Sequence, residues 1–135
     1  MNNEQTLSII KPDAVERNLT ENIKKIFIKN NLKIKENKKI HITKDEAAEF
    51  YKVHQSKPFY NDLCAYLSSG PIFVMILEGE NAVVANRKLM GATDPKDADE
   101  NTIRKLYGIS IDKNSVHGSD SVENAKKEIE FFFKN

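Results

Sequence analysis

The sequence predicts an α+β fold, in which a small antiparallel β-sheet has helices packed on it as a sandwich of the ferredoxin-like kind. Short apolar runs of strand length alternate with segments of helical periodicity along the 135 residues. They do not form the long regular series of strand–helix–strand units typical of doubly wound folds. No internal repeat, low-complexity tract or linker interrupts the chain. Its length suits one ordinary domain, so we expect a single domain over residues 1–135, with helices on one face of the sheet.

The N-terminal third is expected to contribute a strand, a helix and a second strand. Residues 6–11 (TLSIIK) are apolar, β-branched and followed by a proline, which predicts a buried strand with Lys11 at its end. Residues 14–30 carry apolar side chains three and four apart, with lysines on the other face, which predicts a helix. Residues 32–42 alternate more like a strand, with Asn37 as its weakest point.

The middle of the chain predicts two helices, a strand and another helix. Thr43 followed by Glu46 has the pattern of a capping box at a helix start. A further helix is expected over residues 60–67. The continuous apolar run IFVMIL, residues 72–77, is the best candidate for a central strand. Residues 81–90 then predict a helix that ends at a glycine.

The C-terminal part begins with the polar, turn-rich loop GATDPKDADE. A short helix is expected over residues 101–107, and a short strand or turn over residues 115–118. Asp120 and Glu123 then predict the capped start of a last helix. The apolar face of that helix would comprise Val122, Ala125, Ile129, Phe132 and Phe133.

The composition excludes several classes of protein. The 21 basic and 20 acidic side chains leave a net charge of +1, short of the basic balance typical of nucleic-acid binders. The single cysteine, Cys64, allows no intramolecular disulfide and no zinc site built on several cysteines, and it fits a reducing compartment. No basic segment leads a long apolar run, and no run approaches the ~18 residues of a membrane span. We therefore expect a cytoplasmic protein with neither nucleic acid nor membrane as a partner.

Arginine is rare in this chain, so its positions are informative. Lysine supplies all the basic side chains except Arg17, Arg87 and Arg104. Arg87 and Arg104 flank the polar loop around Thr93, and a rigid guanidinium fork suits phosphate oxygens better than a flexible ammonium group. They are candidates for a phosphate clamp, or else ordinary surface or salt-bridging arginines. Arg17 has no such setting and is interpreted as structural or surface.

Several other side chains allow both a functional and a structural interpretation. Lys11, at the end of a core strand, could reach a site at the edge of the sheet or be solvated. Phe59 follows a proline at a helix start, where it could stack on a base or belong to the core. Tyr51 lies on the apolar face of its helix, where packing is the default. His41 and His54 have no partner at ligand spacing and are interpreted as structural.

The stretch NSVHGSDS, residues 114–121, surrounds His117 with small polar residues. Gly118 permits close approach, and Ser119 lies near a helix N-terminus, where anions are favoured. On a helical wheel, Glu128 lies at the margin of the apolar face of the last helix. It could orient one ring nitrogen of His117 and leave the other free to attack, or it could be a solvated glutamate.

Three kinds of chemistry could use His117. The sequence has no G-x-S-x-G elbow for a Ser-His-Asp hydrolase, and the other two histidines supply no ligand set for a metal. Nucleophilic catalysis on phosphate needs an imidazole, an orienting carboxylate and cationic clamps, which this sequence supplies best. A free imidazole has a pKa near ~6.5, so its lone pair is available at physiological pH without a separate base.

The chain resembles the nucleoside diphosphate kinase family over essentially its whole length. The matching blocks, in order, are TLSIIKPDAV, KPFYNDL, SGPIFVMILEGENAV, LMGATDP, TIRKLYG and NSVHGSDSVENAKKEIEFFF. The resemblance implies a ping-pong phosphotransferase that moves the γ-phosphoryl group of ATP or another triphosphate to a nucleoside diphosphate through a phosphohistidine. It also implies broad base specificity, Mg²⁺ bound mainly through the nucleotide phosphates, and a homo-oligomer, either a tetramer or a hexamer.

The resemblance also implies a role for individual residues. His117 would be the nucleophile, through Nδ1, while Glu128 and Ser119 hold the ring. Phe59 would stack on the base, with Ile111 on the other face of the base. The contacts to the phosphates, the ribose and the transition state would come from Lys11, Tyr51, Arg87, Thr93, Arg104 and Asn114.

Some positions depart from the family pattern, and other functions stay open. Glu21 and Asn101 stand where glycine is usual, and Tyr107 replaces a common phenylalanine. A different backbone near residue 101 could shift Arg104. Alternatives are a non-catalytic binding module on the same kind of sheet and a phosphohistidine-forming hydrolase or mutase. The near-neutral charge argues against RNA binding, and the intact set around His117 argues against a degenerate enzyme.

Overall fold

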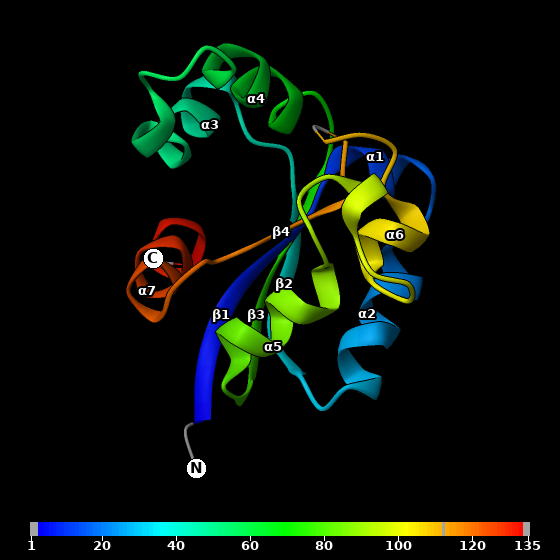
Figure 1. Ribbon diagram of the computed structural model, residues 1–135. Coiled ribbons are helices and arrows are strands. Elements are labelled where there is room, and N and C mark those ends of the chain that lie inside the picture. The colour runs from blue at the N-terminus through cyan, green and yellow to red at the C-terminus, as the bar shows by residue number, and fades with distance from the viewer. Residues whose placement is uncertain (1–2, 112, 134–135) are drawn as a thin grey trace.

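The computed structural model describes residues 3–111 and 113–133. Its sheet is four-stranded and antiparallel, with the order β2-β3-β1-β4 (Figure 1). This arrangement confirms the predicted α+β class and places the apolar run of β3 inside the sheet. The strands are β1 (Asn3–Ile10), β2 (Lys33–Ile40), β3 (Ile72–Glu80) and β4 (Val116–Gly118).

Helices cover both faces of the sheet, so the expectation of helices on one face is wrong (Figure 1). One face carries α1 (Pro12–Glu16), α2 (Thr20–Lys29), α5 (Ala82–Met90) and α6 (Ile103–Tyr107). The other face carries α3 (Lys44–Phe50), α4 (Tyr60–Leu67) and α7 (Val122–Phe133). Two single-turn 3-10 helices complete the described elements, η1 (Lys52–His54) and η2 (Pro95–Asp97).

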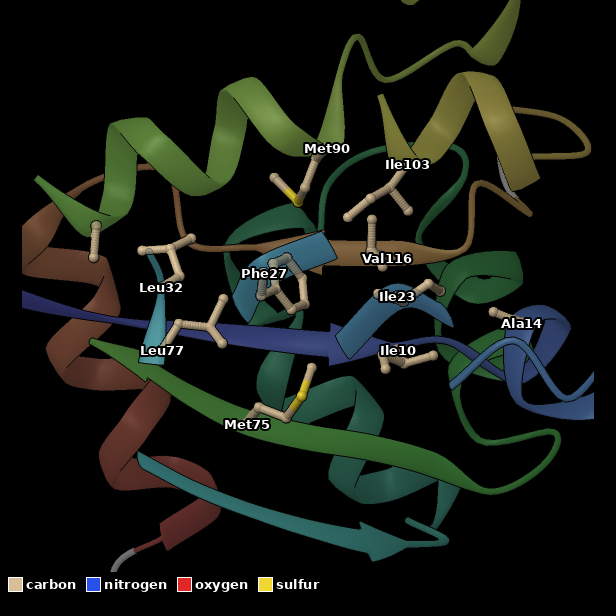
Figure 2. Close-up of a cluster of buried hydrophobic side chains, with 11 residues drawn as sticks. Ile10, Ala14, Ile23, Phe27, Leu32, Met75, Leu77, Met90, Ile103 and Val116 are labelled. Carbon is tan, nitrogen blue, oxygen red and sulfur yellow. The ribbon is translucent and has the colours of Figure 1, made fainter. Parts of the chain in front are cut away.

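The two central strands supply side chains to a core on each side of the sheet. Successive side chains of a strand point to opposite faces, so Leu7 and Ile9 pack towards α7 while Ile10 packs towards α2. Strands buried on both faces have nearly continuous apolar sequences, as IFVMIL does. TLSIIK departs from this at Thr6 and Ser8, which are nevertheless fully buried in β1. Figure 2 shows the core on the α2 side, which includes Ile10, Ile23, Phe27, Met75, Leu77, Met90 and Val116.

The single helix expected over residues 14–30 is two helices, α1 and α2. Between them Asn18 has a φ of 60°, a left-handed conformation that asparagine tolerates better than most residues. Because the sequence has helical periodicity on both sides of Asn18, it gave no sign of this break. The first strand also ends one residue earlier than expected, at Ile10, because Pro12 opens α1.

The irregularity in β2 lies elsewhere than the sequence predicted. The register against β3 shifts between Ile34 and Glu36, whereas Asn37 pairs regularly with Met75. A β-bulge places one extra residue in a strand where the pairing with its neighbour requires it. The strand propensity of single residues does not predict that place.

Helix caps were predicted correctly for α3 and incorrectly for α7. In α3 both bonds of the capping box are present, since Thr43 and Glu46 each accept the other's backbone N–H, at 3.1 and 2.9 Å. In α7 the Ser121 hydroxyl accepts the Asn124 N–H at 3.0 Å, so Ser121 rather than Asp120 caps the helix. Asp120 instead accepts a bond from the Asn124 side chain at 2.6 Å.

The apolar face of α7 is narrower than predicted, because Val122 is exposed while Ala125 and Phe132 are buried. Within the described residues, the helices are too short or too polar to traverse a lipid bilayer.

Candidate active site

A cavity of about 750 Å³ brings together predicted residues from distant parts of the chain. Its wall includes the residue after β1, the ends of α3 and α5, the start of α4, one turn of α6 and the loop before β4. Ser119 and Glu128 lie behind this wall rather than in it. The predicted residues that line the cavity are Lys11, Tyr51, Phe59, Arg87, Thr93, Arg104, Ile111, Asn114 and His117.

His117 lies on β4, paired with Ile9 of β1. Its Nε2 is 3.1 Å from Oε1 of Glu128, which also accepts the Ser119 hydroxyl at 2.8 Å. The Leu7 N–H donates to the Ser119 oxygen at 3.3 Å. A carboxylate accepts only, so this arrangement favours the tautomer that carries its proton on Nε2 and a lone pair on Nδ1. The sheet, α7 and the imidazole are thereby joined by one chain of hydrogen bonds.

Two packing contacts fix the strand and ring of His117, and the sequence did not identify the partner in either. Phe50 meets the imidazole edge to face, with 5.3 Å between ring centroids. Gly118 lies so close to α5 that an added Cβ would be 2.3 Å from Nδ2 of Asn86 and 2.7 Å from Cε of Met90. The close approach that Gly118 permits is therefore that of a helix. The only sequence signal for Phe50 was its place in the helical periodicity of α3.

Arg104 is a buried cation held by backbone carbonyls. Its two terminal nitrogens donate to the carbonyls of Gly91 at 3.0 Å and Val116 at 2.9 Å. Its Nε has no hydrogen-bond partner in the described part of the chain. Burial, followed by the positive charge of Arg87, lowers the pKa of Arg104 to about 10. A buried charge without a counter-ion is costly, so this position favours an anionic ligand.

Asn114 holds three parts of the wall in place. Its Oδ1 accepts the Lys11 ammonium group at 2.9 Å, and its Nδ2 donates to the carbonyls of Thr93 and Ile111, both at 3.0 Å. Both amide hydrogens are thus engaged within the protein, and Oδ1 retains some accepting capacity. Lys11 itself is only 6% exposed.

The two departures from glycine have different local settings. Asn101 has a φ of 70°, so it adopts the left-handed conformation for which glycine is the usual choice. Thr102 then caps α6, the helix that carries Arg104, through its hydroxyl, which accepts the Lys105 N–H at 3.3 Å. Glu21 lies exposed in the first turn of α2, where an acidic side chain favours the helix.

The mouth of the cavity is apolar and cationic. Phe59 and Ile111 are 45% and 55% exposed. The Lys57 ammonium group lies 5.6 Å from the centre of the Phe59 ring. Burial, then the charges of Lys57 and His117, lower the pKa of His54, which also lines the cavity. His54 thus lies in the wall of the cavity, whereas His41 bonds to the Ser68 carbonyl at 2.8 Å.

The side chains that line this cavity carry four fixed positive charges, on Lys11, Lys57, Arg87 and Arg104. Among the described residues, no carboxylate lines it. Charges of one sign in a low-dielectric cleft raise the local concentration of counter-ions. The cavity is therefore built for a polyanion placed next to an imidazole.

Comparison with known proteins agrees with this geometry. The family model for nucleoside diphosphate kinase matches residues 4–135. The chain belongs to the nucleoside diphosphate kinase family. A nucleoside diphosphate kinase of a Nitratiruptor species is 59% identical over 130 residues, which are 96% of this chain and 95% of that protein. One of Rhizorhabdus wittichii is 56% identical over 134 residues, 99% of this chain and 96% of that protein.

The likeness to this family extends to the three-dimensional structure. A crystal structure of the nucleoside diphosphate kinase of Aquifex aeolicus superimposes with a TM-score of 0.97 at 40% sequence identity. That match covers 99% of this chain and 97% of the other. As a family member the chain is an enzyme, a kinase of nucleotide metabolism, which confirms the class predicted from the sequence.

Proposed function

We propose that the chain transfers the γ-phosphoryl group of a nucleoside triphosphate to a nucleoside diphosphate through a phosphohistidine on Nδ1 of His117. One observation carries the proposal: His117 commits Nε2 to Glu128 at 3.1 Å and lies in a cavity whose charged side chains are all cationic among the described residues. The ring is held by the protein on one side and offers a nucleophile on the other.

The first half-reaction forms a phosphorus–nitrogen bond. The Nδ1 lone pair attacks the γ-phosphorus of the donor, and the bond from that phosphorus to the β–γ bridging oxygen breaks. The nucleoside diphosphate leaves with the electron pair of that bond. The imidazole then carries positive charge, which the Glu128 carboxylate stabilises across the 3.1 Å bond.

The second half-reaction reverses the first with a different nucleotide. A terminal phosphate oxygen of the acceptor diphosphate attacks the phosphorus, the bond to Nδ1 breaks, and its electrons return to the ring. Donor and acceptor use one site in turn, which is a ping-pong cycle. No step requires a proton to leave or join His117, so the orienting bond to Glu128 can persist throughout.

Lys11, Arg87 and Arg104 are proposed to bind the phosphates. Charge in the transition state of phosphoryl transfer is spread over the equatorial oxygens, and positioned cations stabilise it. The unpaired Nε of Arg104 and the exposed guanidinium of Arg87 support this role. Tyr51, Thr93 and Asn114 are proposed as the polar contacts to ribose and phosphate, as the family resemblance implies.

The base is proposed to lie between Phe59 and Ile111 at the mouth. Stacking on an aromatic ring does not distinguish bases, because every base has a π-face. The exposure of both side chains supports a base that lies near solvent. Broad base specificity follows from this arrangement.

Mg²⁺ is proposed to enter as part of the nucleotide substrate. Within the described ranges, no group of three or more His, Cys, Asp or Glu side chains could hold a metal ion. Magnesium that is bound through substrate phosphates needs few protein ligands, so a cationic wall is compatible with it. The ion would neutralise phosphate charge, while Lys11 and the arginines orient the oxygens.

We further propose that the chain works as one domain, in a homo-oligomer (a tetramer or hexamer) located in the cytoplasm. The buried free thiol of Cys64 supports a reducing compartment. The mass in solution, against 15.4 kDa for one chain, would test the assembly, and a monomer would contradict it.

Labelling with a γ-³²P triphosphate tests the central step. We expect acid-labile, base-stable label on the protein, its transfer to a diphosphate with another base, and complete loss in His117→Ala. His41→Ala is the matched control, since its imidazole only bonds a backbone carbonyl, and it should label normally. Label that survives in His117→Ala contradicts the proposal. Release of free phosphate instead of transfer would indicate a hydrolase. Nucleotide binding without any labelling of the protein would indicate a binding module.

A further inference from the structure

The residue two positions before His117 has a backbone conformation that requires support. Ser115 has a φ of 74°, and across it the Val116 N–H donates to the Asn114 carbonyl at 2.9 Å. This φ and a bond between residues two apart are the features of the strained form of γ-turn. Strained residues persist only where the surrounding structure over-determines them. The turn joins Asn114 in the cavity wall to the strand that carries His117.

Asp13 and Arg17 surround the Ser115 side chain. The Ser115 hydroxyl donates to Oδ2 of Asp13 at 3.1 Å and accepts from Arg17 at 3.3 Å. Arg17 binds the same carboxylate oxygen at 3.0 Å. Asp13 is 5% exposed, and its other oxygen accepts the hydroxyl of Tyr66. Burial and the Asp13 carboxylate raise the pKa of Tyr66, which therefore remains a donor.

The same group of side chains reaches two other parts of the site. Arg17 donates to the Tyr107 carbonyl at 2.6 Å, at the end of the helix that carries Arg104. The Lys11 backbone N–H donates to the Ser115 carbonyl at 2.9 Å. Ser115 is therefore hydrogen-bonded directly to Lys11 and is linked through Arg17 to the end of α6. None of Asp13, Arg17 and Ser115 lines the cavity itself.

We propose that Asp13 and Arg17 are positioning residues, which hold the strained turn at Ser115 and thereby set the location of His117 relative to the bound phosphates. The inference rests on the proposed phosphoryl transfer. Arg17, which the sequence presented as structural or surface, thus acts on the reaction through Ser115. Misplacement of a reacting atom by about 1 Å slows a reaction about 100-fold, so a small relaxation of this turn has a measurable effect.

Two substitutions test the proposal with turnover. Ser115→Ala removes the hydroxyl and leaves the Asp13–Arg17 ion pair, and Arg17→Gln removes the charge. At saturating donor, each should slow phosphorylation of His117 about 10- to 100-fold, with nucleotide Kd changed less than about threefold. Because both substitutions act through one turn, the double variant should phosphorylate His117 at about the same rate as the slower of the two single variants. Lys127→Gln, which breaks an exposed i,i+4 pair elsewhere, is the control and should be unchanged.

A second readout does not depend on turnover. The imidazole NMR resonances of His117 in the nucleotide-free protein should shift in Ser115→Ala and Arg17→Gln and stay in place in Lys127→Gln. Lower melting temperatures with unchanged phosphorylation rates, strictly additive effects, or unmoved His117 resonances would each overturn the positioning role. If the wild type is not labelled, the proposed phosphoryl transfer is wrong. The His117 resonances would then still show whether Ser115 and Arg17 set the position of His117.

Discussion

At the scale of single residues, the three histidines differ in how their ring nitrogens are partnered. His117 bonds a carboxylate eleven residues further on, and His41 bonds a carbonyl 27 residues away. His54 has an Nδ1 without a hydrogen-bond partner among the described residues. The sequence suggested Glu128 as the partner of His117, whereas the Ser68 carbonyl beside His41 and the place of His54 in the cavity wall depend on the fold.

The environment of His54 predicts an acid-dependent loss of stability. Its pKa is lowered in the folded protein, mainly by burial, so the folded state binds a proton less readily than the unfolded chain. Stability is then complete above the unfolded pKa near ~6.5 and falls as the pH drops below it. We expect the melting temperature to fall less between pH 7.5 and pH 5 in His54→Gln than in the wild type. An equal fall in both proteins would contradict this expectation.

At the scale of elements, the short strand β4 is positioned by two neighbours. It pairs with β1 through three residue pairs, Ser8–Gly118, Ile9–His117 and Ile10–Val116. On one side it packs against α5 at Gly118. A strand of three residues has little stability alone, so the place of His117 depends on β1 and α5 more than on β4.

Gly118→Ala should therefore disturb the site as well as the fold. The new Cβ would lie 2.3 Å from Nδ2 of Asn86 and 2.7 Å from Cε of Met90, so these two buried side chains must repack or β4 must move away from α5. We expect a loss of about 1–3 kcal/mol in the free energy of unfolding, measured in denaturant, together with slower labelling of His117.

Gly70→Ala is the matched control for this substitution. Its nearest neighbour would be Cβ of Pro12 at 3.6 Å, an ordinary contact, so stability and labelling should be nearly unchanged. If the two alanine variants behave alike, the packing argument for Gly118 is wrong.

At the scale of the whole molecule, net charge and local charge lead to different conclusions. The chain carries a net charge of only +1, yet the charged side chains that line the cavity are cationic throughout the described residues. The near-neutral balance argued against a polyanion binder as a first interpretation, yet the fold brings Lys11, Arg87 and Arg104 from three separate segments around one cavity.

This concentration of charge predicts salt-sensitive nucleotide binding. Calorimetry on His117→Ala, which cannot transfer phosphate in the proposed mechanism, should show triphosphate affinity falling about tenfold between 50 mM and 500 mM NaCl. A diphosphate, with less charge, should show a smaller fall. Affinities that do not change with salt would contradict a cationic phosphate site.

The amino-acid pattern alone predicts the fold class, the central strands, the capping box of α3 and the stretch that carries His117. These features depend on local periodicity, on side-chain branching and on the family blocks, all of which can be read within a few residues. Three features are visible only in the folded chain: helices cover both faces of the sheet, Asn18 divides a helix, and Arg17 bonds Ser115. The first and third depend on residues far apart in the chain, such as Asp13 and Ser115 at 102 residues, which only packing brings together. The break at Asn18 depends on one left-handed φ, which the helical periodicity around it does not reveal.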